Sequence, residues 1–160
     1  MEFTELMKGF ATKVGMTGLQ LAEDGVCRVE IDGMAISFVE VPETRQLVTW
    51  AEVGEPPPEG RERLYRVLME SMYMGKATGG STFSIDSESG LVYLFRLDPL
   101  PLLDLDTFML MLEKFVNVLE EWRKIVADYR EVASDLEKTA AEADEQVRQM
   151  GMGANGFMQV

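Results

Sequence analysis

The sequence has 160 residues, of which 46% are hydrophobic and 27% are charged, the composition of an ordinary globular chain. With 28 acidic against 15 basic residues its formal net charge is −13, which disfavours nucleic acid and anionic membrane surfaces as partners. It contains no His, which excludes His-based triads and His-ligated zinc, and its lone Cys27 excludes an intrachain disulfide. No apolar run is long enough to span a membrane, and residues 1–5 are acidic where a secretion signal would be basic. We therefore expect a cytoplasmic protein.

The first third of the chain predicts a helix followed by an antiparallel meander. Apolar residues recur at helical spacing ahead of Gly15, which predicts a helix over residues 3–14. From Leu19 the period changes to two, and the segments 19–21, 27–31, 34–41 and 46–53 have the apolar content of strands. Between two of them, Asp32-Gly33 is typical of a tight hairpin turn because Asp and Gly tolerate a positive φ.

The middle of the chain predicts a second helix and a hairpin. Residues 54–60 hold three consecutive prolines, which exclude a helix or a central strand. Residues 61–74 are predicted as a helix that Gly75 ends. This helix is apolar over most of its circumference, which indicates burial on two sides. Strands are then expected over residues 82–86 and 91–97, joined by a turn over residues 87–90.

From Leu105 onward a heptad seam predicts one long helix as far as Met150. Large side chains dominate the seam up to Tyr129, and alanines become common after it. We therefore expect three parts: an α/β domain over residues 1–126, a projecting or loosely docked helical extension over 127–150, and a flexible tail over 151–160.

Four features that could suggest chemistry have simpler explanations. The glycine-rich segment 75–81 lacks the order and the following helix of a phosphate-binding loop, and the acidic segment 86–90 fits a hairpin turn better than a calcium loop. Asp104 and Asp106 suit the start of the last helix, and Cys27 suits a core position. We expect no metal, no cofactor and no catalytic residue, although an enzyme built on acids alone is a third hypothesis.

Two features exceed what a monomeric core needs. The segments 34–39 and 91–95 are apolar on both strand faces, whereas one face of an antiparallel sheet usually meets water. The chain also holds 12 Met, a residue typical of adaptable binding surfaces. Either helices and a dimer mate cover these faces, or part of the surface is kept for the apolar side chains of a partner.

The order helix, three strands, helix, hairpin, helix resembles the class I type III secretion chaperones, the family of the Tir chaperone, over about residues 3–126. Besides the first helix and the helix over residues 115–122, the segments that carry this resemblance are Leu19-Gln20-Leu21, Asp24-Gly25-Val26-Cys27, Ile31-Asp32-Gly33, Leu64-Tyr65-Arg66-Val67-Leu68-Met69-Glu70-Ser71, Phe83-Ser84-Ile85-Asp86, Gly90-Leu91-Val92-Tyr93-Leu94 and Leu97-Asp98-Pro99-Leu100. The chain departs from the family in that its last helix continues well past Trp122.

The resemblance implies an α+β fold of the order α-β-β-β-α-β-β-α and a homodimer in the bacterial cytoplasm. Such proteins are not enzymes; they hold the N-terminal region of a secreted effector in an extended form and deliver it to the export apparatus. The alternative is a general dimeric interaction module of the same fold outside secretion.

We predict two contact surfaces. The dimer interface is expected on the middle helix, at Leu64, Tyr65, Leu68, Met69, Met72 and Tyr73. The effector is expected across the first helix and first strands, with a pocket lined by Phe10, Leu19, Leu21, Ile36, Phe38 and Trp50. Strand alternation leaves open which of these lie in the core. For the helical extension, a contact with an export component and a solvated appendage without a role both remain open.

Overall fold

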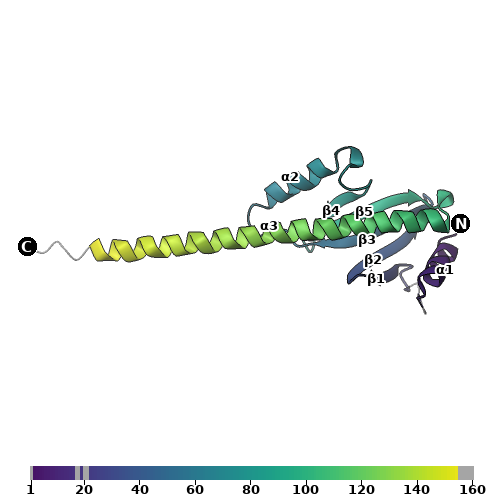
Figure 1. Cartoon of the computed structure of the whole chain (residues 1–160), viewed down its shortest axis with the longest axis horizontal. Helices are drawn as coiled ribbons and strands as arrows, with labels where there is room; N and C mark the ends of the chain where they lie inside the picture. The colour runs from purple at the N-terminus through teal and green to yellow at the C-terminus, as the bar shows by residue number, and fades with distance from the viewer. Residues whose placement is uncertain (1, 17–18, 20–21, 155–160) are drawn as a thin grey trace, which may run out of the picture.

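The protein is described by a computed structural model over residues 2–16, 19 and 22–154. Helix α1 (Phe3–Val14) precedes strands β1 (Cys27–Ile31), β2 (Met34–Val41) and β3 (Gln46–Gly54). Helix α2 (Arg61–Ser71) and a 3₁₀ turn, η1 (Tyr73–Gly75), lead to strands β4 (Thr82–Ile85) and β5 (Val92–Pro99). A second 3₁₀ turn, η2 (Leu100–Leu102), precedes helix α3 (Leu105–Ala154). The predicted α-β-β-β-α-β-β-α order is confirmed (Figure 1).

The five strands form one antiparallel sheet in the order β1-β2-β3-β5-β4. The β1–β2 hairpin turns at Asp32 and Gly33, whose φ values of 51° and 73° are those that the Asp-Gly pair favours. Because β5 pairs with β3, the sheet has two free edges, at β1 and at β4. Of the strand predicted at residues 19–21, Leu19 is in no strand, and Gln20 and Leu21 lie outside the described residues.

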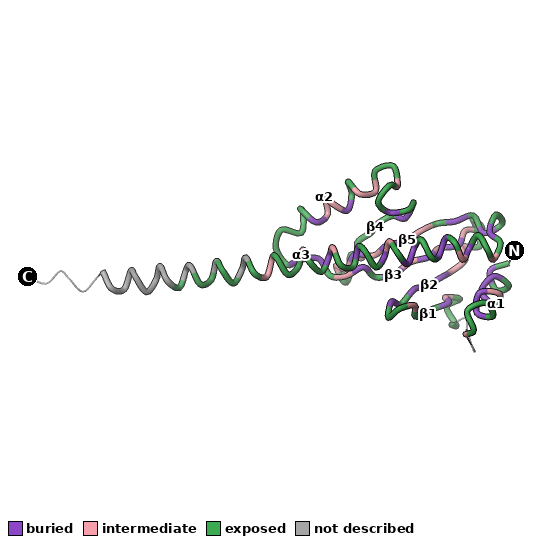
Figure 2. Tube along the Cα trace, in the orientation of Figure 1, coloured by how far each residue is buried: buried purple, intermediate pink, exposed green. Residues whose placement is uncertain are grey.

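One hydrophobic core lies between one face of the sheet and the helices. At its centre Phe10 of α1, Phe38 of β2 and Phe108 of α3 make edge-on ring contacts, with centroids 5.6–6.2 Å apart. The buried apolar strand residues all belong to this one cluster, which includes Ile36 and Leu94. Helices α1 and α3 thus cover the same face of the sheet, which we call the inner face (Figure 2).

Helix α2 lies beside α3, near the β4 edge of the sheet (Figure 1). Its Leu64 and Leu68 are buried in the core cluster. The following loop is fixed to α3, because Trp122 donates a hydrogen bond of 3.1 Å from Nε1 to the Ala77 carbonyl. The helix is shorter than the predicted 61–74: it ends at Ser71, and Met74 adopts a left-handed φ of 59° that breaks helical geometry.

Helix α3 is 50 residues long, about 75 Å at 1.5 Å per residue. Among the described side chains, Val126, which is 1% exposed, is the last buried one, and Tyr129 is the last that packs against the core. Beyond this point the helix leaves the sheet and projects into solvent (Figures 1 and 2). The helix extends beyond the expected boundary at residue 150, through Gly151 and Gly153 to Ala154, and the flexibility of this end stays a prediction. Residues 155–160 lie outside the described residues.

Candidate partner-binding surfaces

The face of the sheet opposite the core has an apolar centre, and none of the described helices packs on it. Its centre consists of five side chains, which we call the outer face: Val39, Val48, Trp50, Phe95 and Leu97. They form two cross-strand rows, because Val39 pairs with Val48 and Val48 with Leu97, while Trp50 pairs with Phe95. None of the five packs against the core cluster, and Leu97 is 49% exposed. A sheet face of this kind is suited to bind apolar side chains of another chain.

The structure separates the predicted partner-binding residues. Phe10, Ile36 and Phe38 are at most 1% exposed, so these three assignments need correction: α1 and α3 cover them, and a ligand on the surface of this chain cannot reach them. Trp50 alone of the six lies on the outer face. Leu19 is half-buried against the core, and Leu21 lies outside the described residues.

Sequence reasoning missed four residues of the outer face, namely Val39, Val48, Phe95 and Leu97. The signal was present, since residues 34–39 and 91–95 are apolar at both odd and even positions. Alternation divides such a strand into two sets without saying which set the helices cover. The pairing of β3 with β5 places the side chains that the helices do not cover, such as Trp50 and Phe95, next to one another.

The predicted dimer-interface residues also divide between two environments. Leu64 and Leu68 are buried within the chain, and Tyr65 and Met72 pack partly against its core. The remaining two, Met69 and Tyr73, are 70% and 75% exposed, and Met74 beside them is 75% exposed. We call Met69, Tyr73 and Met74 the α2 stripe. It is an apolar surface at the end of α2 that the described chain leaves uncovered.

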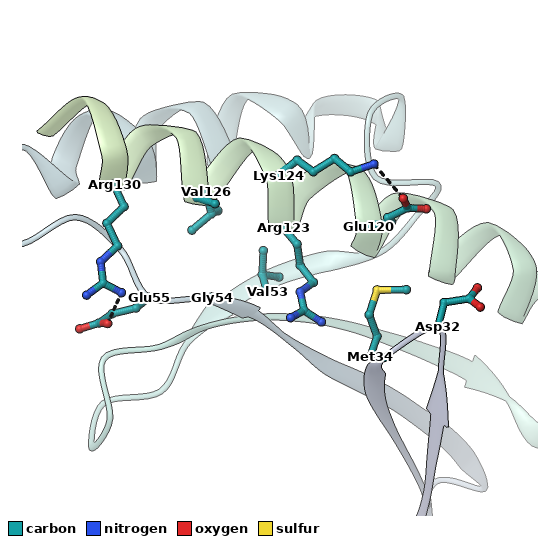
Figure 3. A pocket seen from close by; sticks show the side chains of 12 residues that line it. Asp32, Met34, Val53, Gly54, Glu55, Glu120, Arg123, Lys124, Val126 and Arg130 are labelled. Carbon is teal, nitrogen blue, oxygen red and sulfur yellow. Dashed lines mark hydrogen bonds and ion pairs between the residues drawn. The ribbon is translucent and has the colours of Figure 1, made fainter. Parts of the chain in front are cut away.

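A groove lies between the β1–β2 turn, the end of β3 and α3 (Figure 3). Its volume is about 640 Å³, within the range of ligand-binding clefts. Apolar side chains, among them Met34, Val53 and Val126, form its floor. Three cations of α3 stand around it: Arg123, Lys124 and Arg130.

The residues considered above as possible chemical sites, Asp86, Asp104 and Cys27, have structural roles. Asp86 accepts hydrogen bonds from the Ser89 hydroxyl and from turn amides, and these bonds lower the pKa of its carboxyl. Asp104 caps α3 by accepting a bond of 2.8 Å from the Thr107 amide, and its pKa is lowered by bonds from Thr107. Cys27 is buried, which raises the pKa of its thiol.

In the described part of the chain, no three His, Cys, Asp or Glu side chains are grouped so as to hold a metal ion. Over the same residues no helix has the length and apolar character that crossing a membrane requires. The surfaces that remain for function are the outer face, the α2 stripe and the groove.

Comparison with known proteins gives two kinds of match. The sequence model of the Tir chaperone protein (CesT) family matches residues 5–123. A Chlamydia pneumoniae protein, CPj0713/CpB0740, is 32% identical over 94 residues, which cover 58% of this chain and 72% of that protein.

Two solved structures have a similar fold. A chain of the HopA1–SchA chaperone–effector complex is 18% identical, with a TM-score of 0.65 over 76% of this chain and 93% of that one. A chain from the complex of the Yersinia pestis type III secretion chaperone SycH with a stable fragment of YscM2 is 18% identical, with a TM-score of 0.59 over 76% and 99%. The match to the family model ends at residue 123, so the whole projecting part of α3 lies beyond it.

Proposed function

Because this chain belongs to the Tir chaperone protein (CesT) family, we propose that it is a type III secretion chaperone. It binds the N-terminal region of an effector, keeps that region extended and competent for secretion, and delivers it to the export apparatus from the bacterial cytoplasm. The observation that carries this proposal is the uncovered outer face of the sheet, found in a chain of a chaperone family. The likeness to a chain of a chaperone–effector complex supports it.

The sheet offers an extended segment two kinds of contact. The free edge of β1 presents unpaired backbone groups, to which a strand can add through main-chain hydrogen bonds. The outer face presents Trp50, Phe95 and Leu97 to its apolar side chains. Backbone bonding holds a segment extended without regard to its sequence, and apolar contacts give affinity, which together suit a chaperone.

We further propose that the α2 stripe forms a homodimer interface around a two-fold axis. Its three exposed apolar side chains lie close together in the sequence, and an isologous contact would cover both copies of the stripe at once. The projecting part of α3 lies outside this interface. We assign to it a contact with a component of the export apparatus.

The proposal is tested by capture of a secreted protein from the native host. The variant Trp50→Glu removes the largest outer-face side chain, and Leu97→Glu changes an exposed neighbour on the same face. Each is expected to weaken capture by tenfold or more, because a large apolar contact contributes about 1.5–3 kcal/mol. Their melting temperatures should remain close to that of the unchanged protein.

The matched control is Leu102→Glu, which places the same charge on a leucine that is 77% exposed and outside the outer face. It should leave capture unchanged. Capture only of proteins that are never secreted would favour the alternative, a dimeric interaction module outside secretion. Equal losses in all three variants would show that charge alone, and not the outer face, governs binding.

A further inference from the structure

The groove beside α3 contains one cation that the chain itself leaves unpaired. Arg130 forms an ion pair with Glu55, and Lys124 Nζ lies 2.7 Å from Glu120 Oε1. Arg123 forms no ion pair and no hydrogen bond with any residue that the structure describes. Arg123 therefore differs from the other two cations of the groove, which carboxylates of the same chain already hold.

The direction of Arg123 makes it available to a ligand in the groove. Its side chain points from α3 into the groove, and its guanidinium lies over the floor near Val53 and Met34 (Figure 3). Asp32 also lines the groove, but Met34 stands between it and Arg123 in this view. A guanidinium over apolar side chains binds a carboxylate well, because two parallel hydrogen bonds form where water is partly displaced.

We propose that the groove binds an extended segment of the effector that carries a carboxylate side chain and, two residues along, an apolar side chain. The carboxylate pairs with Arg123, and the apolar side chain covers Met34, Val53 and Val126. Residues two apart in an extended chain point to the same side, so both can enter one groove. Arg123 is thereby a specificity-determining residue for the acidic position.

The position of the groove favours a peptide segment over a small molecule. It opens at the β1–β2 turn, so a strand added along the free edge of β1 reaches the groove as it passes this turn. The inference rests on the proposed function for the identity of the ligand as an effector. Its recognition chemistry, a carboxylate next to an apolar side chain, is independent of that identity.

The test is an NMR titration of the full chain with three capped pentapeptides: Thr-Glu-Thr-Leu-Thr and its versions with Gln or Lys in place of Glu. The Glu peptide should shift the Arg123 Nε–H resonance and the amides of Val53, Gly54 and Ala127. The Gln peptide should bind at least about tenfold more weakly, since a charge-assisted pair is lost, and the Lys peptide more weakly still.

Two variants distinguish a specific contribution of Arg123 from the effect of any positive charge beside the groove. Arg123→Gln should remove the preference for Glu over Gln, whereas Lys124→Gln should keep it, because Glu120 already holds the Lys124 ammonium. Equal affinity for the Glu and Gln peptides, or resonance shifts confined to the outer face, would overturn the inference.

The failure of this inference can be told from failure of the proposed function. If Trp50→Glu abolishes capture of a secreted protein while the peptides do not discriminate, the chaperone assignment stands and the groove assignment falls. If the Glu peptide binds through Arg123 but no secreted protein is captured, the groove binds acidic segments of other proteins.

Discussion

A single buried ion pair connects the sheet to the loop that follows α2. Arg96 and Asp98 lie two residues apart on β5, and two bonds of 2.6 Å join the guanidinium to both carboxylate oxygens. The same guanidinium donates a 3.1 Å bond to the Gly79 carbonyl. Asp98 is only 7% exposed, so bonds from Arg96 take the place of bonds from water. The pair therefore fixes the loop over the inner face.

We expect Asp98→Asn to destabilise the protein by about 3 kcal/mol, because it leaves Arg96 partly buried without a counter-charge. Urea unfolding followed by circular dichroism measures this change. As a control, Asp24→Asn removes an exposed pair with Arg28 and should change the free energy of unfolding far less. Similar values for the two variants would mean that the Arg96 pair contributes no more than a surface pair.

Cys27 reports on the stability of the edge strand β1. Its thiol is fully buried on the inner face, and burial raises its pKa, so both access and ionisation oppose reaction. In the folded protein a thiol reagent should label Cys27 at least about 100-fold more slowly than in the urea-unfolded chain. Comparable rates in both states would show that β1 separates readily from β2.

At the residue scale, the sequence shows which side chains are apolar but not which face of the sheet each of them occupies. Phe10, Ile36 and Phe38 are apolar and were expected to bind a partner, yet they form the core. Trp50 has the same apolar character but lies on the opposite face. The difference is set by which face α1 and α3 cover, and this depends on packing between segments far apart in the chain.

At the scale of elements, periodicity located the three α-helices and the five strands of the sheet. Its errors lie at helix ends, where local conformation decides. Helix α2 ends early because Met74 takes a left-handed conformation, which no repeat of apolar residues reports. Helix α3 continues beyond its expected end because isolated glycines weaken a helix by only about 1 kcal/mol each and do not terminate it.

The projecting part of α3 is expected to be dispensable for folding. A chain truncated after Arg130 keeps the packing of Tyr129 and the ion pair of Arg130 with Glu55. Its free energy of unfolding should differ by less than about 1 kcal/mol from that of the full chain, because the described side chains beyond this point bury little area. Effector binding should persist, and delivery to the export apparatus should be impaired.

Truncation after Val126 provides the comparison. It removes Tyr129 and Arg130 as well, and so should lower stability further while the chain still folds. Loss of folding in either truncated chain would place the extension in the core of the protein. Full secretion of the effector by the chain that ends at Arg130 would exclude a contact with the export apparatus.

On the scale of the whole molecule, net charge opposes the association of two copies of the chain, whereas exposed apolar surface favours it. The net charge of −13 keeps copies of the chain apart, and a dimer doubles that charge. In the proposed dimer, apolar contacts of the α2 stripe must outweigh this repulsion. Added salt screens the repulsion, so association should strengthen between low and physiological ionic strength.

The dimer is tested most directly at Met69, which is 70% exposed. In an isologous interface each residue of the stripe meets the stripe of the other copy, so Met69→Asp brings two like charges into an apolar contact. Sedimentation at micromolar concentration should show a dimer for the unchanged protein and at least about tenfold weaker association for the variant. Leu110→Asp, on an exposed face of α3, supplies the same charge outside the stripe and should leave the dimer intact. A stable monomer in the unchanged protein, or an unchanged dimer in Met69→Asp, would contradict an interface at α2.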